Sequence, residues 1–459
     1  PVDSDTALNI EGVLVNEGSL QFTANNDYIG KINVTGSIED RDSKLTIDPD
    51  GIYTPGKTYS LEFVFENGNS KDINWKGQEQ YRQGMLYSKY DAGGVTFALD
   101  NPLGESGDQN TDNAFNALVA FGSSSNENTR SVAQAVYRLD GPRASRVLRD
   151  IGGGENSLAV SMNMRHNSAA VSLSKHLDSQ FGRFSFDASQ KENDEYGWVD
   201  LGRNRNNFGR GLGKLNGSSV TIGVDKNLDS KWRYGFYAGY ENDRYSSDSA
   251  TDKNKNTRLG LFRAFSNDVN RGHIYMEYGF GRNDNDRSIR DLGLKADSSY
   301  RHHAFEIGGE YKHIHNYSNG KDYHFAPYVN ASFARYSQKK YSETGAGIFN
   351  QQVKAFEDTL ITFEGGLEFQ REAKKGSYTA RIGYKSIVSS ANPSLSFAYE
   401  GNPDVFYENR TKIDRDFITA SFNLEYRLKR NLSLSADFSL EKGKHDSFCS
   451  ANIWLDKRL

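Results

Sequence analysis

The chain has 459 residues and a formal net charge of −4, and so near-neutral a charge gives no reason to expect a nucleic-acid partner. It contains one cysteine, Cys449, which excludes a disulfide within the chain. The mean hydropathy is −0.74, and no apolar run approaches the roughly 18 residues of a membrane-spanning helix. The chain opens on Pro1-Val2-Asp3 without the features of a signal sequence, so we expect an exported protein to carry one upstream.

Residues 1–108 form a predicted β-rich arm. Short apolar couplets such as Leu8 and Ile10 recur between Asn, Gly, Asp and Ser, which indicates short strands joined by tight turns. Their unequal spacing favours the C-terminal end of a β-solenoid. Trp75 and Phe97 are candidates for a cap over its last turn, because terminal repeats differ from inner ones. An ordinary small β-domain is the alternative.

The hydrophobic period changes to that of helices after residue 108. Residues 109–154 predict three short helices that form a linker, the last ending at its three consecutive glycines. Residues 155–181 contain no Gly or Pro, and as a helix rising about 1.5 Å per residue they would span the hydrocarbon core of ~30 Å.

The segment 155–181 is nevertheless too polar to face lipid. Its central polar residues are Asn163, Arg165, His166 and Asn167. We therefore expect this helix to thread a wet lumen. The alternative is an amphipathic helix packed on the β-rich arm.

From residue 182 to the C-terminus, apolar and polar residues alternate in segment after segment. Ile418, Ala420 and Phe422, for example, alternate with Thr419 and Ser421. Successive side chains of a strand point to opposite faces, so each segment has one apolar and one polar face, as in a transmembrane β-barrel. The predicted strands lie near 194–203, 216–226, 231–246, 251–264, 270–284, 297–313, 321–336, 354–371, 376–388, 415–428, 430–442 and 446–457.

The predicted connections between these strands alternate in length. Residues 204–215, 285–296, 337–353 and 389–414 form the long connections, and the turns between them are short. In bacterial outer-membrane barrels the long loops face outside and the short turns face the periplasm. Because the first connection is long, the first strand should begin in the periplasm and the twelfth should end there.

The alternation also assigns the two faces of the barrel wall. Phe363 and Tyr384 are among the residues expected to face lipid, and inward glycines such as Gly239 and Gly308 would leave room inside. The charged inward residues are either a solvated wall or hydrogen-bond partners of a helix in the pore. The lumen-facing candidates are Glu277, Glu306, Glu310, Glu364, Glu368, Arg381, Lys385, Glu425 and Arg427.

No motif for catalysis, cofactor binding or metal binding stands out. The chain lacks Gly-x-Ser-x-Gly, His-Glu-x-x-His and a phosphate-binding loop. We therefore predict no catalytic, cofactor-binding or metal-binding residues and no enzyme activity. Two alternatives stay open: an outer-membrane barrel enzyme of the phospholipase or protease type, and a diffusion porin with an open lumen.

The order of elements resembles the C-terminal part of a type V (classical) autotransporter. Three stretches carry the resemblance: Tyr53-Thr54-Pro55-Gly56-Lys57-Thr58-Tyr59, Lys231-Trp232-Arg233-Tyr234-Gly235-Phe236-Tyr237-Ala238-Gly239-Tyr240 and Phe325-Ala326-Pro327-Tyr328-Val329. The expected fold is mainly β. A 12-stranded antiparallel transmembrane β-barrel at 182–459 would hold a lumen helix at 155–181, preceded by the linker helices 109–154 and the passenger end 1–108.

The resemblance implies an outer-membrane translocator that anchors an adhesin-like passenger and displays it outside the cell. Its implied partners are outer-membrane lipid, the barrel assembly machinery, periplasmic chaperones and a host or cell-surface ligand of unknown identity; no cofactor or nucleic acid is expected. Two departures from the family matter. The chain ends on Leu459, whereas family members usually end on a Phe or Trp that the assembly machinery reads, so the resemblance does not imply efficient assembly. Residues 155–181 contain no Asn-Asn pair, so we predict none of the self-cleavage that some members perform there.

Overall fold

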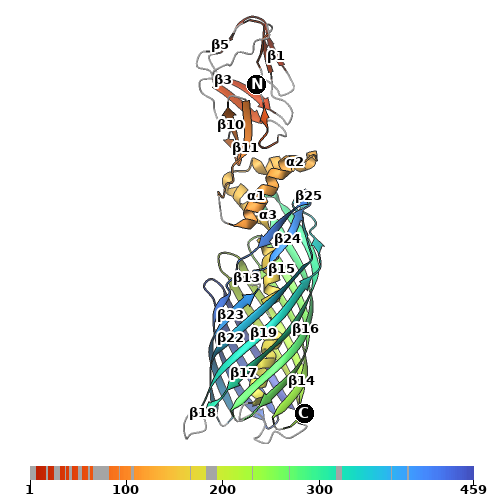
Figure 1. Cartoon of the computed structure of the whole chain (residues 1–459), viewed down its shortest axis with the longest axis vertical. Coiled ribbons are helices and arrows are strands. Elements are labelled where there is room, and N and C mark those ends of the chain that lie inside the picture. Colours follow the sequence, from red (N-terminus) through yellow and green to blue (C-terminus); the bar gives the residue numbers. More distant parts are fainter. Residues whose placement is uncertain are drawn as a thin grey trace.

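The structure is a computed structural model that describes residues 7–16, 19–24, 31–36, 38–40, 44–49, 54–59, 63–65, 82–91, 94–104, 108–165, 167–181, 194–229, 231–267, 269–316, 323–373, 375–389 and 392–459. The described residues form an elongated molecule (Figure 1), with β-structure near the N-terminus, a group of helices, and a barrel at the other end. The expected mainly β fold is therefore confirmed.

Near the N-terminus, short strands pair in parallel, three of the four described pairs at an offset of 24 or 25 residues and the fourth, Ile32 with Phe63, at 31. The strands are β1 (Ala7–Ile10), β2 (Leu14–Asn16), β3 (Ser19–Ala24), β4 (Lys31–Val34), β5 (Ile38–Asp40), β6 (Lys44–Pro49) and β8 (Phe63–Phe65). Paired positions include Ala7 with Lys31, Leu14 with Ile38, and Ser19 with Lys44. Parallel pairing at a repeat of 24 or 25 residues is the geometry of stacked solenoid turns.

A small antiparallel sheet follows the parallel strands. It consists of β7 (Thr58–Tyr59), β9 (Arg82–Gln83), β10 (Leu86–Asp91) and β11 (Gly94–Leu99), in the order β7-β11-β10-β9. Phe97 of β11 is fully buried in one apolar core with Leu86 and with the helices that come next. Trp75, the other predicted cap residue, lies outside the described residues.

Three helices connect the β-rich arm to the barrel: α1 (Gln109–Gly122), α2 (Glu127–Tyr137) and α3 (Gly141–Gly152). Each begins after a residue whose side-chain oxygen accepts a hydrogen bond from a backbone N–H of the first turn, namely Asp108, Asn126 and Asp140. Gly153, at φ 62°, ends α3 in a left-handed conformation that favours glycine. None of the described helices is both long enough and apolar enough to cross a membrane.

In the described part of the chain, twelve long strands pair antiparallel and close into a barrel (Figure 1). They are β12 (Glu195–Phe208), β13 (Gly213–Asn227), β14 (Trp232–Ser246), β15 (Ala250–Ser266), β16 (Asn270–Ile289), β17 (Leu294–His313), β19 (Tyr323–Gln338), β22 (Phe356–Ala373), β23 (Gly376–Ser389), β26 (Asp416–Lys429), β27 (Leu432–Lys442) and β28 (Ser447–Arg458). The ring closes where the last strand, β28, pairs with the first, β12. The predicted number of strands is confirmed.

The barrel wall is polar inside and apolar outside. On β16, Ile274, Met276 and Tyr278 are exposed on the outer surface, whereas Glu277 between them is buried in the lumen. The same alternation runs along β22, where Phe363 is 52% exposed and Glu368 is 4% exposed. An apolar belt around a charged interior is the arrangement that lipid outside and water inside require.

Two of the four long connections predicted from the sequence are short in the structure, so that part of the prediction is wrong. Within 204–215, β12 continues to Phe208 and β13 begins at Gly213, so a four-residue turn remains. Within 285–296, β16 and β17 likewise continue and meet at the short helix η1 (Arg290–Leu292). These strand ends carry mostly polar residues, because they rise beyond the apolar belt, but their backbones stay paired with their neighbours.

The other two long connections carry a second small sheet above the barrel. It contains β20 (Tyr341–Ser342), β21 (Gln351–Val353), β24 (Ser394–Tyr399) and β25 (Asn402–Arg410), with η2 (Gly347–Phe349) between β20 and β21. The sheet packs against the linker helices: the Asn110 side chain of α1 bonds the backbone of Arg410, and Phe121 packs on Tyr399. At the opposite end, the two-residue β18 (His315–Asn316) pairs with β19.

Candidate functional site in the barrel lumen

Two helices, rather than the one expected over 155–181, lie inside the barrel (Figure 1). The helix α4 (Gly154–Arg165) ends before Asn167, and α5 (Ser168–Phe181) begins after it. The side-chain oxygen of Asn167 accepts a hydrogen bond from the backbone N–H of Ala170 at 3.1 Å, which is the bond of an N-cap residue. The cap starts a new helix. His166 lies outside the described residues.

At the upper end of the lumen, the turn between α3 and α4 is held by a buried ion pair. Arg287 of β16 and Glu343 are both almost fully buried, and their side chains are 2.5 Å apart. Arg287 also donates to the backbone carbonyl of Asp150 at 2.6 Å, at the end of α3. A Cβ on Gly153 would lie 2.5 Å from the amide of Gln351, so the turn fits its surroundings only with a glycine there.

A second contact fixes α3 at the barrel rim. The carboxylate of Asp291 in η1 accepts hydrogen bonds from Arg146 at 2.8 Å and from Arg143 at 3.4 Å. The hydrogen bond from Arg146 lowers the pKa of Asp291 below its ordinary value. The carboxylate therefore stays charged, and α3 is tied to the rim from two sides.

In the middle of the lumen, Asn167 bridges two of the predicted lumen-facing carboxylates. Its side-chain NH2 donates to Glu277 at 2.5 Å and to Glu306 at 2.7 Å. Arg258 of β15 is 2.5 Å from Glu277 and compensates part of this negative charge. Tyr237 and Tyr275 each donate a hydrogen bond to one of the two carboxylates. The helix break between α4 and α5 is thus fastened to two wall strands, β16 and β17.

The two other predicted residues of the lumen segment that the structure describes also bond the barrel. Asn163 donates to the side-chain oxygen of Asn283 at 3.0 Å. Arg165 reaches the opposite side and donates to the backbone carbonyl of Asp414 at 2.7 Å. Every described member of the predicted lumen set on α4 and on the break after it is therefore bonded to the wall or to its loops.

Near its C-terminal end, α5 is held by charged side chains. Lys175 pairs with Asp437, and His176 lies between Asp225, 2.8 Å from its Nε2, and Asp456 on the other side. Asp178 pairs with Lys312 and with the predicted lumen residue Arg381. Glu310 and Glu368 join the same network through Arg381.

The remaining predicted lumen residues lie on the inner wall and bond other wall residues. Glu364 accepts hydrogen bonds from Tyr328 at 2.9 Å and Thr419 at 2.8 Å. Glu425 is buried and accepts a hydrogen bond from Ser377 at 3.4 Å. Arg427 is half-buried on the same strand, and Lys385 pairs with Glu441 at 2.9 Å.

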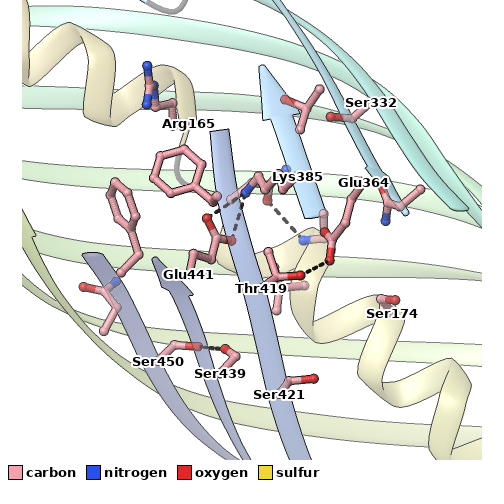
Figure 2. A pocket seen from close by; sticks show the side chains of 18 of the residues that line it. Arg165, Ser174, Ser332, Glu364, Lys385, Thr419, Ser421, Ser439, Glu441 and Ser450 are labelled. Atoms are coloured by element: carbon pink, nitrogen blue, oxygen red, sulfur yellow. Dashed lines mark hydrogen bonds and ion pairs between the residues drawn. The ribbon is translucent and has the colours of Figure 1, made fainter. Parts of the chain in front are cut away.

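The lumen helices do not fill the barrel evenly. The helix α5 packs against β12 to β16, which leaves a cavity of about 300 Å³ toward the opposite wall. Figure 2 shows Ser332, Glu364, Lys385 and Thr419 on that wall and Ser174 of α5 facing the same space. The helices therefore obstruct the lumen but leave a narrow space beside them, lined by both polar and apolar residues.

Several contact residues were not among the sequence-based candidates: Arg258, Asp200, Asp225, Asp437 and Asp456. All occupy inward positions of strands that were predicted, and all are buried. Alternation extended to every strand would have placed them in the lumen. Only the three-dimensional structure pairs the four aspartates with Ser172, Lys175 and His176 of α5, and Arg258 with Glu277 of the wall.

An apolar belt, a polar interior and a helical segment that threads the lumen define a membrane β-barrel occupied by its own chain. The family model of the Autotransporter beta-domain matches residues 196–439, more than half of the sequence, and this chain belongs to that family. Its barrel is accordingly an autotransporter translocator domain, and the family is one of outer-membrane barrels that are not enzymes in themselves. No curated protein matches the sequence.

Solved structures of translocator domains are similar to this chain. The translocator domain of the autotransporter NalP from Neisseria meningitidis matches with a TM-score of 0.50 at 15% identity, over 63% of this chain and 98% of that one. The beta domain of the Bordetella autotransporter BrkA matches with a TM-score of 0.47 at 15% identity, over 58% of this chain and all of that one. At 15% identity the likeness to the NalP translocator domain shows the fold alone.

Proposed function

We propose that this translocator barrel anchors an N-terminal passenger and displays it at the bacterial surface. The path of the chain supports this most directly. The linker helices lie at one mouth of the barrel, α4 and α5 run through the lumen, and β12 begins at the other mouth. If the passenger crosses the membrane through the lumen, the segment that joins it to the first barrel strand must lie inside the barrel, and its backbone must be hydrogen-bonded internally.

The polar character of this segment supports a passage through the lumen. Its Arg165 would cost at least ~2.5 kcal/mol near the centre of a bilayer, and Asn163 and Asn167 would add to that cost. In the lumen all three side chains have hydrogen-bond partners instead. The mouth that holds the linker helices is then extracellular, and the mouth with β18 and the C-terminus is periplasmic.

We further propose that the passenger is an adhesin-like β-solenoid. The parallel strands with a repeat of 24 or 25 residues support a solenoid, which presents a long side surface to partners. We also propose that periplasmic chaperones and the barrel assembly machinery deliver and insert the barrel, because its exposed apolar belt needs protection in water. The ligand would be a host or cell-surface molecule.

The two alternatives receive less support. A diffusion porin requires an open lumen, whereas α4 and α5 occupy this one. A barrel enzyme of the phospholipase or protease type requires titratable groups that are arranged for catalysis. The titratable groups of the lumen instead bond α5 and one another.

Protease treatment of intact cells tests the display proposal. The chain is produced with an export signal and an epitope before Pro1, in a bacterium with an outer membrane. We expect added proteinase to remove the epitope from intact cells and to leave a barrel-sized C-terminal fragment, while a periplasmic marker stays intact. Loss of the epitope only after the outer membrane is permeabilised would contradict display.

A further inference from the structure

A row of cationic side chains crosses the outer surface of the barrel. Lys255 of β15 lies opposite Arg282 of β16, and Arg282 lies opposite Arg301 of β17. All three are exposed, and the residues that alternate with them, such as Asn254 and Asn283, are buried in the lumen. The three cations therefore point away from the barrel on neighbouring strands.

Two more cations extend this row upward. Arg244 of β14 lies opposite Lys253 of β15, two residues along the strand from Lys255, and both are exposed. The acidic group that the described residues place among these five cations is Asp284, 3.0 Å from the Nε of Arg282. The cluster thus keeps a net positive charge of four, from five cations and one carboxylate.

Charged residues on the strands that follow β17 around the wall are arranged differently, on β19 at a position opposite Phe305 of β17. Arg335 of β19 faces outward there, and Glu357 of β22 lies 2.8 Å from it. That pair compensates its own charge, whereas Lys255, Arg282 and Arg301 place like charges directly opposite one another. Like charges at directly opposed positions of a sheet destabilise the pairing, and an external anion bound by this row would offset that repulsion.

The height of the row relative to the apolar belt identifies that anion. Leu259, Tyr278 and Phe305 occupy one outward level of β15, β16 and β17 and are exposed, as residues in the belt are. The next outward level along these strands holds Thr257, Phe280 and His303. The cationic row Lys255, Arg282 and Arg301 is the level after that. Two residues advance about 7 Å along a strand, and barrel strands are tilted, so the row lies just beyond the hydrocarbon, at the depth of lipid headgroups.

We propose that Lys255, Arg282 and Arg301, with Arg244 and Lys253 above them, bind the phosphate groups of lipids in the extracellular leaflet. Guanidinium groups suit this role because they hold phosphate oxygens with two parallel hydrogen bonds. The inference deepens the proposed function, since it rests on the proposed placement of the barrel in the outer membrane. It adds that one side of the barrel recruits phosphorylated lipid.

Lipid retention tests the proposal. The full chain is reconstituted in phosphatidylcholine vesicles that contain a minor fraction of diphosphoryl lipid A, extracted in detergent, and weighed with its bound lipid by native mass spectrometry. We expect the phosphorylated lipid to be enriched on the chain over its share in the vesicles. Each cation near an anionic surface raises the binding constant for that surface about fivefold. The triple variant K255Q/R282Q/R301Q should therefore lose the enrichment. In each single variant the enrichment should fall about fivefold.

A matched control removes three cations at the opposite mouth, in K375Q/K429Q/R430Q, and should keep the enrichment. Equal retention by both triple variants, or equal loss in both, would overturn the proposal. Heat-modifiable gel migration checks that each variant is folded, and the single variants serve as the test if the triple variant is not. A chain that inserts but shows no enrichment overturns the lipid site alone, whereas a chain that never enters the vesicles overturns the membrane function as well.

Discussion

At the scale of single residues, four aromatic side chains of the inner wall each lie over a glycine directly opposite on the next strand. The pairs are Trp198 with Gly223, Tyr237 with Gly260, Tyr275 with Gly308, and Tyr328 with Gly366. A Cβ on any of these glycines would come within 2.9 Å of a ring atom. The missing side chain therefore lets each ring lie against the wall, which leaves the centre of the lumen to α4 and α5.

The substitution Gly260→Ala tests this arrangement. The new Cβ would lie 2.1 Å from Cζ of Tyr237, whose hydroxyl donates to Glu277 at 2.9 Å, so the ring must move and lose that bond. Overpacking of this kind costs about 1–3 kcal/mol. We expect the temperature of heat-induced unfolding, read from gel migration, to fall. Gly365→Ala is the control, since its Cβ would meet one atom at 3.8 Å; an equal fall in both variants would contradict the explanation.

At the scale of elements, neighbouring residues of one strand face different solvents. Phe363 of β22 is on the outer belt, and Thr362 beside it lines the lumen cavity. We expect Phe363→Lys to cost about 2–4 kcal/mol, because the charge enters the hydrocarbon, whereas Thr362→Lys places it in the polar space. Refolding into vesicles at increasing urea concentration measures both. If the two variants lose equal stability, the faces have been assigned wrongly by one residue.

The linker helices and the small sheet above the barrel form an element that depends on the Arg287–Glu343 pair. Glu343→Gln leaves Arg287 buried without its counter-charge, which costs about 3–5 kcal/mol. We expect faster hydrogen exchange in α3 and β21, with unchanged exchange in β26 and β27.

The matched control for this prediction is Asp291→Asn at the barrel rim. It breaks two ion pairs whose arginine side chains are 43% and 46% exposed, and exposed pairs contribute about 0–1 kcal/mol. Exchange in α3 should change little. Equal acceleration in both variants would show that the buried pair has no special part in holding the turn.

How much the sequence predicts depends on whether a feature is local. The strand predicted at 415–428 is Asp416–Lys429 in the structure, because period-two alternation marks a lipid-facing strand residue by residue. Beyond the belt that signal is lost: residues 204–207 are polar on both faces, so the alternation does not show that they continue the strand. The break at Asn167 depends on one capping bond, which no periodicity records.

The lumen contacts show the other limit of the sequence. His176 touches Asp225, 49 residues along the chain, and Asp456, 280 residues along. Alternation places both aspartates on the inner wall, but the rotation of α5 in the barrel decides which of them it meets. Candidate lumen residues such as Glu277 and Glu306 could therefore be assigned to a face, whereas their partners could not.

At the scale of the whole molecule, α4 and α5 should control the conductance of the barrel. A chain that begins at residue 182 retains all twelve barrel strands and the β12–β28 closure, but it lacks the lumen helices. A twelve-stranded barrel lies between small barrels filled by side chains and the open channels of 16 strands or more. We expect this truncated chain to conduct strongly in planar bilayers, once gel migration shows that it is folded.

The control is a chain that begins at residue 155, which lacks the β-rich arm and the linker helices but keeps α4 and α5. The cavity of about 300 Å³ beside α5 allows some ion flow, so this chain should conduct weakly rather than not at all. The difference between the two truncated chains then measures the lumen helices themselves, because both lack the β-rich arm and the linker helices and both keep the small sheet above the barrel. Equal conductance would show that α4 and α5 do not occupy the lumen in the membrane, and the proposal of a passenger path through the barrel would lose its main support.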